Sequence, residues 1–266
     1  MEKAIAIIPA RYDSKRLPGK PLRKILNRPL IEWVYESASK ASALDEVFVT
    51  TDSEEVISCV KGFGGKVIKT SSHHQSGTDR VGEASKKLHL SPEDVVVNIQ
   101  SDEPLISPRA LKALISSIAG DKGIEMATLI YPSSKRDEFE DANVVKVVVD
   151  KDDFALYFSR SPIPHFELGS SNRFVFLKHL GVYGYTMRFL QKIIKITPSS
   201  LEKRENLEQL RVLEHGYKIK VVRSLDDSAS VNIEEDLKKV ERLILKEPVD
   251  NHLIQFYNSL IEEREV

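Results

Sequence analysis

The sequence predicts an α/β fold: a mostly parallel sheet with helices on both faces and a small antiparallel β insertion. Short β-branched runs alternate with segments of helical period up to about residue 131. Close-set strand-like runs, with no room for crossover helices, follow between residues 144 and 185. The first pattern is typical of βαβ units, whose parallel strands are covered on both faces and present ligand sites at their carboxyl ends. The second pattern favours an antiparallel hairpin or small sheet.

The first half of the chain carries the predicted parallel sheet. Buried strands are expected over residues 4–8, 47–51, 66–70, 95–99 and 126–131. Between them, apolar side chains recur at helical spacing in segments 30–38, 56–60, 81–88 and 111–118. Pro29 suits the first turn of the first helix, and Ser53 can cap the second, which Gly64 or Gly65 can end.

The second half begins with the strand-like runs 144–149, 154–159 and 176–185. Further on, the pattern predicts a helix marked by Leu207, Leu210 and Leu213, a strand over 218–222, and helices over 237–244 and 253–261. No Pro/Gly-rich linker divides the 266 residues. We therefore expect one domain over residues 1–266, with residues 140–190 as an inserted β subdomain.

Composition excludes several classes of protein. The 39 Lys and Arg residues nearly balance the 40 Asp and Glu residues, so the chain lacks the basic field of a general nucleic-acid binder. No apolar stretch approaches the roughly 18–20 residues of a membrane span. The single cysteine, Cys59, cannot form an intrachain disulfide, and nothing near it in sequence would activate its thiol. These features predict a soluble cytosolic protein.

The segment IPARYDSKRLPGKPL, residues 8–22, follows the first strand and carries four cations: Arg11, Lys15, Arg16 and Lys20. It lacks the glycine patterns of a P-loop or a dinucleotide-binding fold. A glycine-containing turn with converging cations can nevertheless hold a polyanion through backbone N–H groups and charge. Its position at the carboxyl end of a strand favours that interpretation over a solvated surface loop.

The segment VVVNIQSDEP, residues 95–104, ends a buried strand in Gln100, Asp102 and Glu103. Carboxylate oxygens at this edge of the sheet suit Mg²⁺, which binds through one or two carboxylates together with substrate phosphates. The alternative is a polar turn in which Asp102 or Glu103 caps the next segment. Cations and carboxylates on neighbouring strand ends together favour a nucleoside triphosphate site.

Six segments in order resemble the 3-deoxy-manno-octulosonate (Kdo) cytidylyltransferase, or CMP-Kdo synthetase, family. They are IPARYDSKRLPGKPL, HQSGTDR (74–80), NIQSDEP (98–104), FALYFSRSPIP (154–164), KHLGVYGY (178–185) and LEQLRVLEHGYKIKV (207–221). CMP-sialate synthetases share the general opening loop, but the later motifs are closer to the Kdo branch. The resemblance covers nearly the whole chain up to the helix at 233–246.

The resemblance implies a Rossmann-like nucleotidyltransferase fold and an enzyme that couples CTP to Kdo, or to a variant such as 8-amino-Kdo. The products would be the CMP-sugar and pyrophosphate, for lipopolysaccharide biosynthesis. It also implies a Mg²⁺ cofactor and a homodimer, for which residues 140–190 and the C-terminal helices are candidate surfaces. A CMP-sialate synthetase and a non-catalytic nucleotide-sugar binding protein remain as alternatives.

The same resemblance implies roles for individual residues. Arg11, Arg16 and Lys20 would contact the phosphates and take part in catalysis, with Lys15 beside them, and Asp102 would be a catalytic metal ligand. The nucleotide would also contact Ser76, Arg80 and Gln100. The residues implied to line the sugar pocket are Gln100, Arg160, His179, Tyr183, Glu208 and Gln209.

Two positions depart from the family pattern. Asn232, in SASVNIEED, stands where the family has a second metal-binding aspartate, so a neutral amide oxygen replaces a carboxylate and metal binding is expected to be weaker or differently arranged. Ser101 stands where the family usually has glycine. Asn232 is the feature that keeps the non-catalytic alternative open.

Overall fold

The computed structural model describes residues 2–14, 16–74, 76–166 and 174–245. Its strands are β1 (Ala4–Pro9), β2 (Lys24–Ile25), β3 (Arg28–Pro29), β4 (Glu46–Thr51), β5 (Val67–Lys69), β6 (Val95–Ile99), β7 (Met126–Ser133), β8 (Lys146–Val149), β9 (Ala155–Ser159), β10 (Phe176–Thr186) and β11 (Lys220–Arg223). Its α-helices are α1 (Leu30–Ser39), α2 (Glu54–Gly62), α3 (Gly77–Lys87), α4 (Pro108–Ala119), α5 (Arg136–Glu140), α6 (Met187–Ile193), α7 (Ser200–Glu205), α8 (Gln209–Glu214) and α9 (Glu234–Leu245). A 3₁₀ turn, η1, covers Lys20–Leu22.

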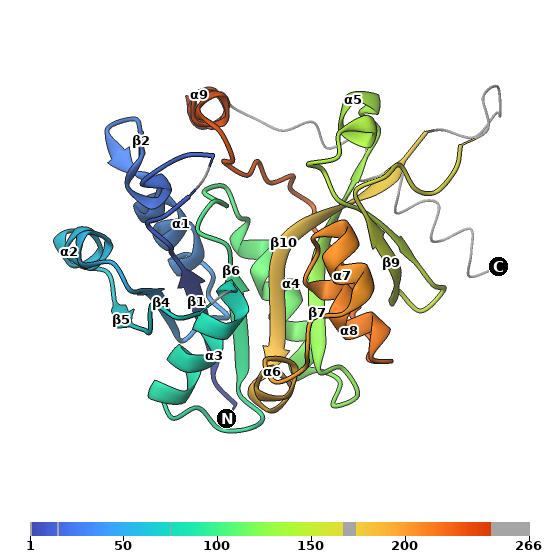
Figure 1. The fold of residues 1–266 in the computed structure, drawn as a ribbon, viewed down its shortest axis with the longest axis horizontal. Helices are drawn as coiled ribbons and strands as arrows, with labels where there is room; N and C mark the ends of the chain where they lie inside the picture. Colours follow the sequence, from blue (N-terminus) through green and yellow to red (C-terminus); the bar gives the residue numbers. More distant parts are fainter. Residues whose placement is uncertain (1, 15, 75, 167–173, 246–266) are drawn as a thin grey trace.

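The main sheet has the order β11-β7-β10-β6-β1-β4-β5 (Figure 1). The pairs β6–β1, β1–β4, β4–β5 and β7–β11 are parallel, so the predicted α/β fold with a mostly parallel sheet is confirmed. The predicted strands of the first half are present within two residues at each end, and Ser53 caps α2 as expected.

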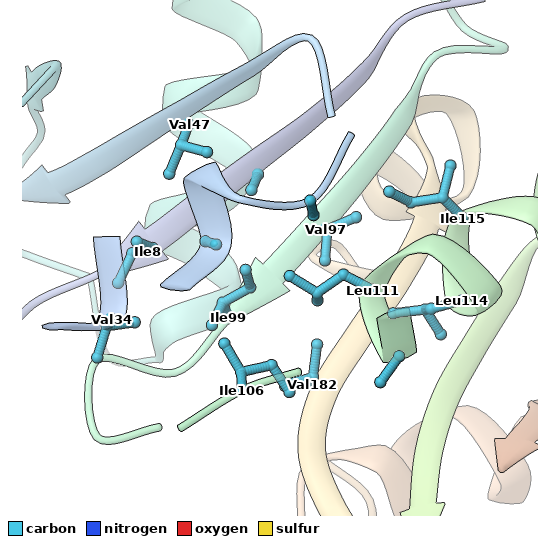
Figure 2. Close-up of a cluster of buried hydrophobic side chains, with 14 of the residues drawn as sticks. Ile8, Val34, Val47, Val97, Ile99, Ile106, Leu111, Leu114, Ile115 and Val182 are labelled. Atoms are coloured by element: carbon cyan, nitrogen blue, oxygen red, sulfur yellow. The ribbon is translucent and has the colours of Figure 1, made fainter. Parts of the chain in front are cut away.

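Helices cover both faces of this sheet because its strands are apolar on both sides. Along β1, Ala6 and Ile8 pack with α1, α2 and α4, whereas Ile5 and Ile7 pack with α3, α6 and α8. Figure 2 shows the first of these layers, where Leu111 of α4 lies near Val97 and Ile99 of β6, and Val34 of α1 lies near Ile8 of β1. Cys59 on α2 packs partly buried beside the same layer, and burial raises the pKa of its thiol.

The predicted antiparallel insertion is the β8–β9 hairpin, which extends the sheet through the N-terminal part of β10. β10 also belongs to the main sheet, which the sequence pattern did not indicate. Over its C-terminal half it runs antiparallel between β6 and β7 and joins the two parallel parts of the sheet. The assignment of residues 140–190 as a separate subdomain stays a prediction.

The helix predicted from Leu207, Leu210 and Leu213 corresponds to α8, and a further helix, α7, precedes it. Asn206 adopts a left-handed conformation, φ 52°, and ends α7, so α8 is a second, separate helix. Glu208 is therefore the N-terminal cap position of α8 rather than a mid-helix residue. α6, which Thr186 caps, was not predicted. The expected helix over 253–261 lies outside the described residues.

α9 lies far from β11, the strand that precedes it in the chain (Figure 1). The segment after β11 crosses to the opening loop (Figure 1), where Leu237 and Val240 of α9 pack with Leu17, Ile25 and Leu30. This small apolar cluster anchors α9 on the opening loop. Within the described part of the chain, no helix is long and apolar enough to cross a bilayer.

Gly184 tests the packing of α4 on β10. A Cβ at this position would lie 2.6 Å from Cδ1 of Ile118 and 3.3 Å from Cγ of Leu114. Because the neighbours sit in a close-packed layer, Gly184→Ala is expected to lower the free energy of unfolding by about 1–3 kcal/mol in denaturant titrations. Ile118→Val removes the clashing methyl and should restore part of the loss. Gly62→Ala, where no atom lies within 4 Å, is the control; an equal loss there would contradict the packing argument.

Candidate functional site

Parallel strands β1, β4 and β6 end at one edge of the sheet, and polar residues follow each of them. Arg11 follows β1, Asp52 follows β4, and Gln100 and Asp102 follow β6. The carboxyl ends of parallel strands form a common edge, so these side chains come from one side of the molecule. This edge carries the candidate site.

A cavity of about 330 Å³, here called the first cavity, opens beside β6 and β10. All six side chains that the sequence assigned to one pocket line it: Gln100, Arg160, His179, Tyr183, Glu208 and Gln209. They come from the ends of β6 and β9, from β10 and from the start of α8, so they span residues 100–209 of the chain. The structure therefore places these residues around one cavity, and their roles in binding a sugar stay predictions.

His179 is held as a neutral hydrogen-bonding group. The single proton of the Thr128 hydroxyl is donated to the Val182 carbonyl at 2.8 Å, and the same oxygen lies 2.9 Å from Nε2 of His179. Nε2 must then be the donor, which leaves Nδ1 as an acceptor. Burial lowers the pKa of His179 to about 3, so the ring is uncharged at neutral pH. The neutral ring cannot act as a cation, and Nε2, which carries the proton, cannot bind a metal.

Thr128 also explains how the cavity wall is shaped. β10 shifts register against β7 between Leu180 and Tyr183, and the Thr128 hydroxyl satisfies the Val182 carbonyl within that irregularity. Sequence reasoning missed Thr128, because only its pairing across the sheet brings it to His179. It also missed Thr78, which lines the cavity, although Thr78 lies inside the HQSGTDR segment and could have been found there.

The remaining wall is rich in buried polar groups. Burial raises the pKa of the Glu208 carboxyl, and a hydrogen bond from Thr78 partly opposes this. Burial, with Glu208 nearby, raises the pKa of Tyr183 well above its usual value. Nε2 of Gln209 is buried and, within the described structure, has no hydrogen-bond partner. An unpaired buried donor beside a cavity suits a ligand with hydroxyl or carboxylate oxygens.

Arg160 is oriented by carbonyl groups. Its Nε donates to Glu205 O at 2.7 Å, Nη1 to Ala142 O at 2.9 Å and Nη2 to Asn206 O at 3.2 Å. Among the described residues, no carboxylate oxygen forms an ion pair with this guanidinium. The group is fixed in place while its charge remains unneutralised, which suits recognition of an anionic ligand.

A second cavity of about 640 Å³ adjoins the first and shares Gly77, Asn206, Leu207 and Glu208 with it. Arg11 and Ser76, both predicted nucleotide contacts, line this second cavity. Arg11 Nη2 donates to His74 O at 3.1 Å, and Ser76 caps α3 in a capping box with Asp79. The second cavity therefore lies next to the first, with these four shared residues at their boundary.

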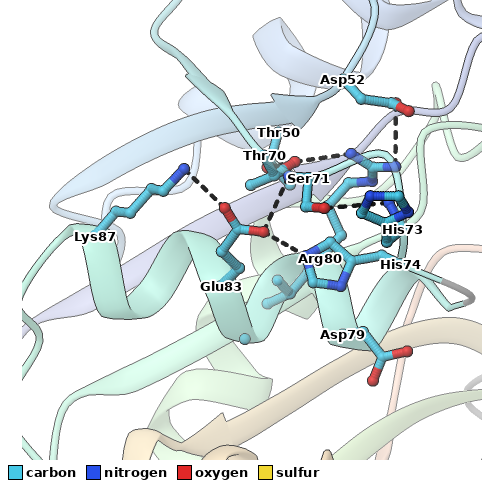
Figure 3. A network of polar contacts seen from close by, with 12 residues as sticks. Thr50, Asp52, Thr70, Ser71, His73, His74, Asp79, Arg80, Glu83 and Lys87 are labelled. Atoms are coloured by element: carbon cyan, nitrogen blue, oxygen red, sulfur yellow. Dashed lines mark hydrogen bonds and ion pairs between the residues drawn. The ribbon is translucent and has the colours of Figure 1, made fainter.

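Arg80 is less accessible than the sequence suggested. Its side chain is 2% exposed, with Nη2 paired to Asp52 at 3.0 Å and Nη1 donating to Thr70 at 2.8 Å (Figure 3). It lies beneath a third hollow that also contains Arg11. Burial lowers its pKa, opposed by Asp52. Its guanidinium group joins α3 to the residues that follow β4 and β5, so Arg80 stabilises the packing of these segments.

The opening loop reaches the end of β6 through an ion pair. Lys20 Nζ lies 2.5 Å from Oδ2 of Asp102, and both side chains are partly buried, 13% and 23% exposed. Gly19 supplies the left-handed turn, φ 64°, that precedes Lys20. The opening loop and the turn after β6 therefore lie side by side, and the roles of Lys20 and Asp102 in binding phosphate and metal stay predictions.

Asn232 also lies at this edge. The N–H of Val231 donates to the Asp102 carbonyl at 2.9 Å, which brings the segment before α9 against the turn after β6. Arg16 Nη2 donates to Oδ1 of Asn232 at 2.8 Å. Lys15 lies outside the described residues.

The hard oxygen donors of Asp102 and Asn232 fit a Mg²⁺ ion that takes its other ligands from phosphates and water. Among the described residues, no group of three or more carboxylate, His or Cys ligands occurs.

Glu103 does not join Asp102 at the cavity edge as the sequence pattern suggested. It is 6% exposed, and its carboxylate accepts a hydrogen bond from the Ser228 hydroxyl. Burial, then the nearby Asp102, raises the pKa of Glu103 to about 7. Glu103 instead links the turn after β6 to the segment that leads to α9.

This raised pKa predicts a stability effect. The folded chain binds the Glu103 proton more tightly than the unfolded chain, so the free energy of unfolding should fall as pH rises from the ordinary value of 4.5 to about 7 and then level off. Glu103→Gln should flatten this slope in denaturant titrations at pH 5 and pH 8 with EDTA present. Glu140→Gln, at an exposed position, serves as the control. An unchanged slope in the Glu103 variant would contradict the assignment.

Comparison with known proteins gives a consistent family. The cytidylyltransferase family model matches residues 5–219. The 3-deoxy-manno-octulosonate cytidylyltransferase of Syntrophobacter fumaroxidans is 46% identical over 247 residues, which cover 93% of this chain and 99% of that protein. The 8-amino-3,8-dideoxy-manno-octulosonate cytidylyltransferase of Shewanella sp. strain ANA-3 is 48% identical over 238 residues, or 89% of this chain and 96% of that protein.

A solved structure agrees with these relatives. The structure of CMP:2-keto-3-deoxy-manno-octonic acid synthetase complexed with CTP matches with a TM-score of 0.84 and 39% identity, over 92% of this chain and 99% of that one. The resemblance inferred from the six motifs is confirmed, and the protein is a nucleotidyltransferase. The chain belongs to the cytidylyltransferases, and among them to the CMP-Kdo synthetase family that its motifs resemble.

Proposed function

We propose that this protein couples CTP to 3-deoxy-manno-octulosonate, or to its 8-amino form, and releases the CMP-sugar and pyrophosphate. One observation carries the proposal: six polar side chains from four segments line one cavity, which adjoins a second cavity lined by Arg11. An acidic, polyhydroxylated sugar fits the first cavity, and a nucleotide fits the second. Relatives named for both sugars are similar to this chain, so we leave the choice between them to the experiment.

The chemistry of the first cavity suits the sugar. The unneutralised Arg160 guanidinium would hold the carboxylate, since an oriented cation binds such a group more strongly than a mobile one. His179 offers Nδ1 as an acceptor for a sugar hydroxyl, and Gln209 offers an unpaired amide donor. Glu208 can accept a hydroxyl, or an ammonium group if the sugar carries one. Gln100 lines the first cavity directly after the end of β6, so it would lie between the sugar and the nucleotide.

The opening loop suits the triphosphate. Arg11, Arg16 and Lys20 would neutralise the charge that collects on the leaving pyrophosphate, and Lys15 is a further candidate contact. Lys20 and Arg16 make single contacts, to Asp102 and Asn232, which phosphate oxygens can replace. Ser76 at the N-terminus of α3 adds a hydroxyl to the nucleotide cavity. Arg80 would act beneath the nucleotide rather than on it.

In the proposed reaction, the anomeric hydroxyl of the sugar attacks the α-phosphorus of CTP. The new bond joins the sugar oxygen to phosphorus, the bond to the β-phosphate oxygen breaks, and the hydroxyl proton is lost. The cavities hold the two reactants in line, and the cations stabilise the charge on the leaving oxygens. A bound Mg²⁺ would supply charge neutralisation and lower the pKa of the attacking hydroxyl. Asp102 and Asn232 would hold it.

A substrate panel tests the function. We expect pyrophosphate release with CTP, Mg²⁺ and either Kdo or 8-amino-Kdo, with kcat/KM at least about 100-fold above that for sialate, because buried polar groups left unpaired discriminate strongly. Product mass identifies the CMP-sugar. Turnover on sialate alone would indicate a CMP-sialate synthetase. Tight CTP binding without turnover on any sugar would indicate a non-catalytic binding protein.

Metal dependence tests the roles of Asp102 and Asn232. EDTA should abolish pyrophosphate release, and Asp102→Asn should lower kcat by roughly 100-fold or more, because catalysis by electrostatic stabilisation is lost. Asn232→Asp should lower the Mg²⁺ concentration needed for half-maximal rate, since a carboxylate replaces a neutral oxygen. Mn²⁺ titration followed by electron paramagnetic resonance measures binding without turnover.

The exposed Asp121→Asn is the matched control for these metal-site variants. Equal Mn²⁺ affinity in wild type, Asp102→Asn and Asn232→Asp would exclude this site.

We also propose a cytoplasmic homodimer, since CTP is a cytoplasmic metabolite and the β8–β9 hairpin presents apolar surface. Leu156 on β9 is 60% exposed, which supports residues 140–190 as part of the dimer contact. Light scattering of the purified chain and of Leu156→Glu measures this directly. A monomeric wild type would exclude it.

A further inference from the structure

Lys146 is a fully buried charge that the proposed reaction does not use. It lies on β8 with 0% exposure, and none of its ammonium contacts is a carboxylate. Its Nζ donates instead to three main-chain carbonyls: Asp141 at 3.0 Å, Val144 at 2.7 Å and Arg160 at 2.6 Å. Since an ammonium group has three N–H bonds, all of its donors are satisfied. A buried lysine held in this way costs desolvation energy, so its retention needs an explanation.

The three carbonyls connect Lys146 to Arg160. One belongs to Arg160 itself, and the other two, of Asp141 and Val144, lie on either side of residues 142–143 in the chain, where the Ala142 carbonyl accepts from Arg160 Nη1 at 2.9 Å. Lys146 therefore fixes both the backbone that carries the guanidinium and the loop that receives it. From the other side, Glu205 accepts the Arg160 backbone N–H at 2.9 Å and the side-chain Nε at 2.7 Å.

We infer that Lys146 is a positioning residue for Arg160: it holds the guanidinium in the first cavity so that it meets the carboxylate of the acidic sugar. This inference rests on the proposed function, which makes Arg160 the carboxylate contact. A lysine can serve here because its ammonium group donates its hydrogen bonds to main-chain carbonyls and so does not compete with Arg160 for the substrate. Without it, the carbonyls of Asp141, Val144 and Arg160 would each lose a hydrogen bond, and the loop around Ala142 would shift.

The first test is kinetic. Lys146→Met keeps the apolar stem and removes the three donors, and we expect KM for the sugar to rise roughly tenfold while KM for CTP and kcat change little. Lys146→Gln keeps an amide donor, so its effect should be smaller, and it serves if the Met variant does not fold. Val147→Ala, on the same strand and also buried, is the matched control. It should lower Tm without changing the sugar KM.

A double-mutant cycle separates positioning from general loss of structure. In an Arg160→Gln background the guanidinium is absent, so Lys146→Met should add little to the sugar KM if it acts through Arg160. Full additivity would overturn the inference. So would an unchanged sugar KM in both Lys146 variants with a fall in Tm like that of Val147→Ala, since Lys146 would then act on stability alone.

A readout that needs no sugar keeps this inference distinct from the proposed function. The Arg160 Nε–H, bonded to Glu205 O, should give a slowly exchanging ¹⁵N–¹H NMR signal, assigned by its absence in Arg160→Gln. In Lys146→Met this signal should exchange faster or broaden, while in Val147→Ala it should persist. An unchanged signal in a folded Lys146→Met would refute the positioning role. Lack of turnover by wild type on every sugar would refute the proposed function and leave this NMR result to decide the structural claim.

Discussion

β10 runs antiparallel between β6 and β7, and the rest of the site depends on this placement. Its hydrogen bonds to both neighbours fix Tyr183 opposite Asn98 on one side and opposite Thr128 on the other. That register brings the KHLGVYGY segment to the strand end that carries Gln100. Because side chains alternate along a strand, a shift of one residue would turn His179 and Tyr183 away from the cavity. The register irregularity after Leu180 completes the wall, and the Thr128 hydroxyl satisfies the carbonyl that it frees.

The buried charges fall into two groups with different consequences. Arg80, Lys146 and Glu103 bind protein groups: Nη1 and Nη2 of Arg80 contact Thr70 and Asp52, Lys146 contacts main-chain carbonyls, and Glu103 contacts Ser228. These charges connect segments. Arg160 retains a positive charge that a ligand can neutralise. Lys20 and Arg16 of the opening loop make contacts that a ligand can replace. The distinction follows from solvation. A charged group enclosed by protein needs hydrogen-bond partners from the protein, whereas a charged group that lines a cavity can be solvated by water until a substrate binds.

The phosphate side of the site is assembled from the two ends of the described chain. The opening loop contributes Lys20, and the segment before α9 contributes Asn232, more than two hundred residues later. A main-chain hydrogen bond from Val231 to Asp102 and the apolar cluster around Leu17 hold these parts together. Folding of α9 onto the loop is therefore a condition for forming the proposed triphosphate and metal site, even though α9 supplies no group to the first cavity.

The sequence by itself determined the alternation of strands and helices, the family, and which polar residues belong to one cavity. These follow from local periodicity and from short motifs, such as the run that ends in Gln100 and Asp102. The tertiary structure decided the rest: that β10 joins the main sheet, that Glu103 turns inward and that Arg80 is enclosed. It also decided that Lys146 binds carbonyls around Arg160. Each depends on pairing or burial between segments distant in the chain, which no local pattern records.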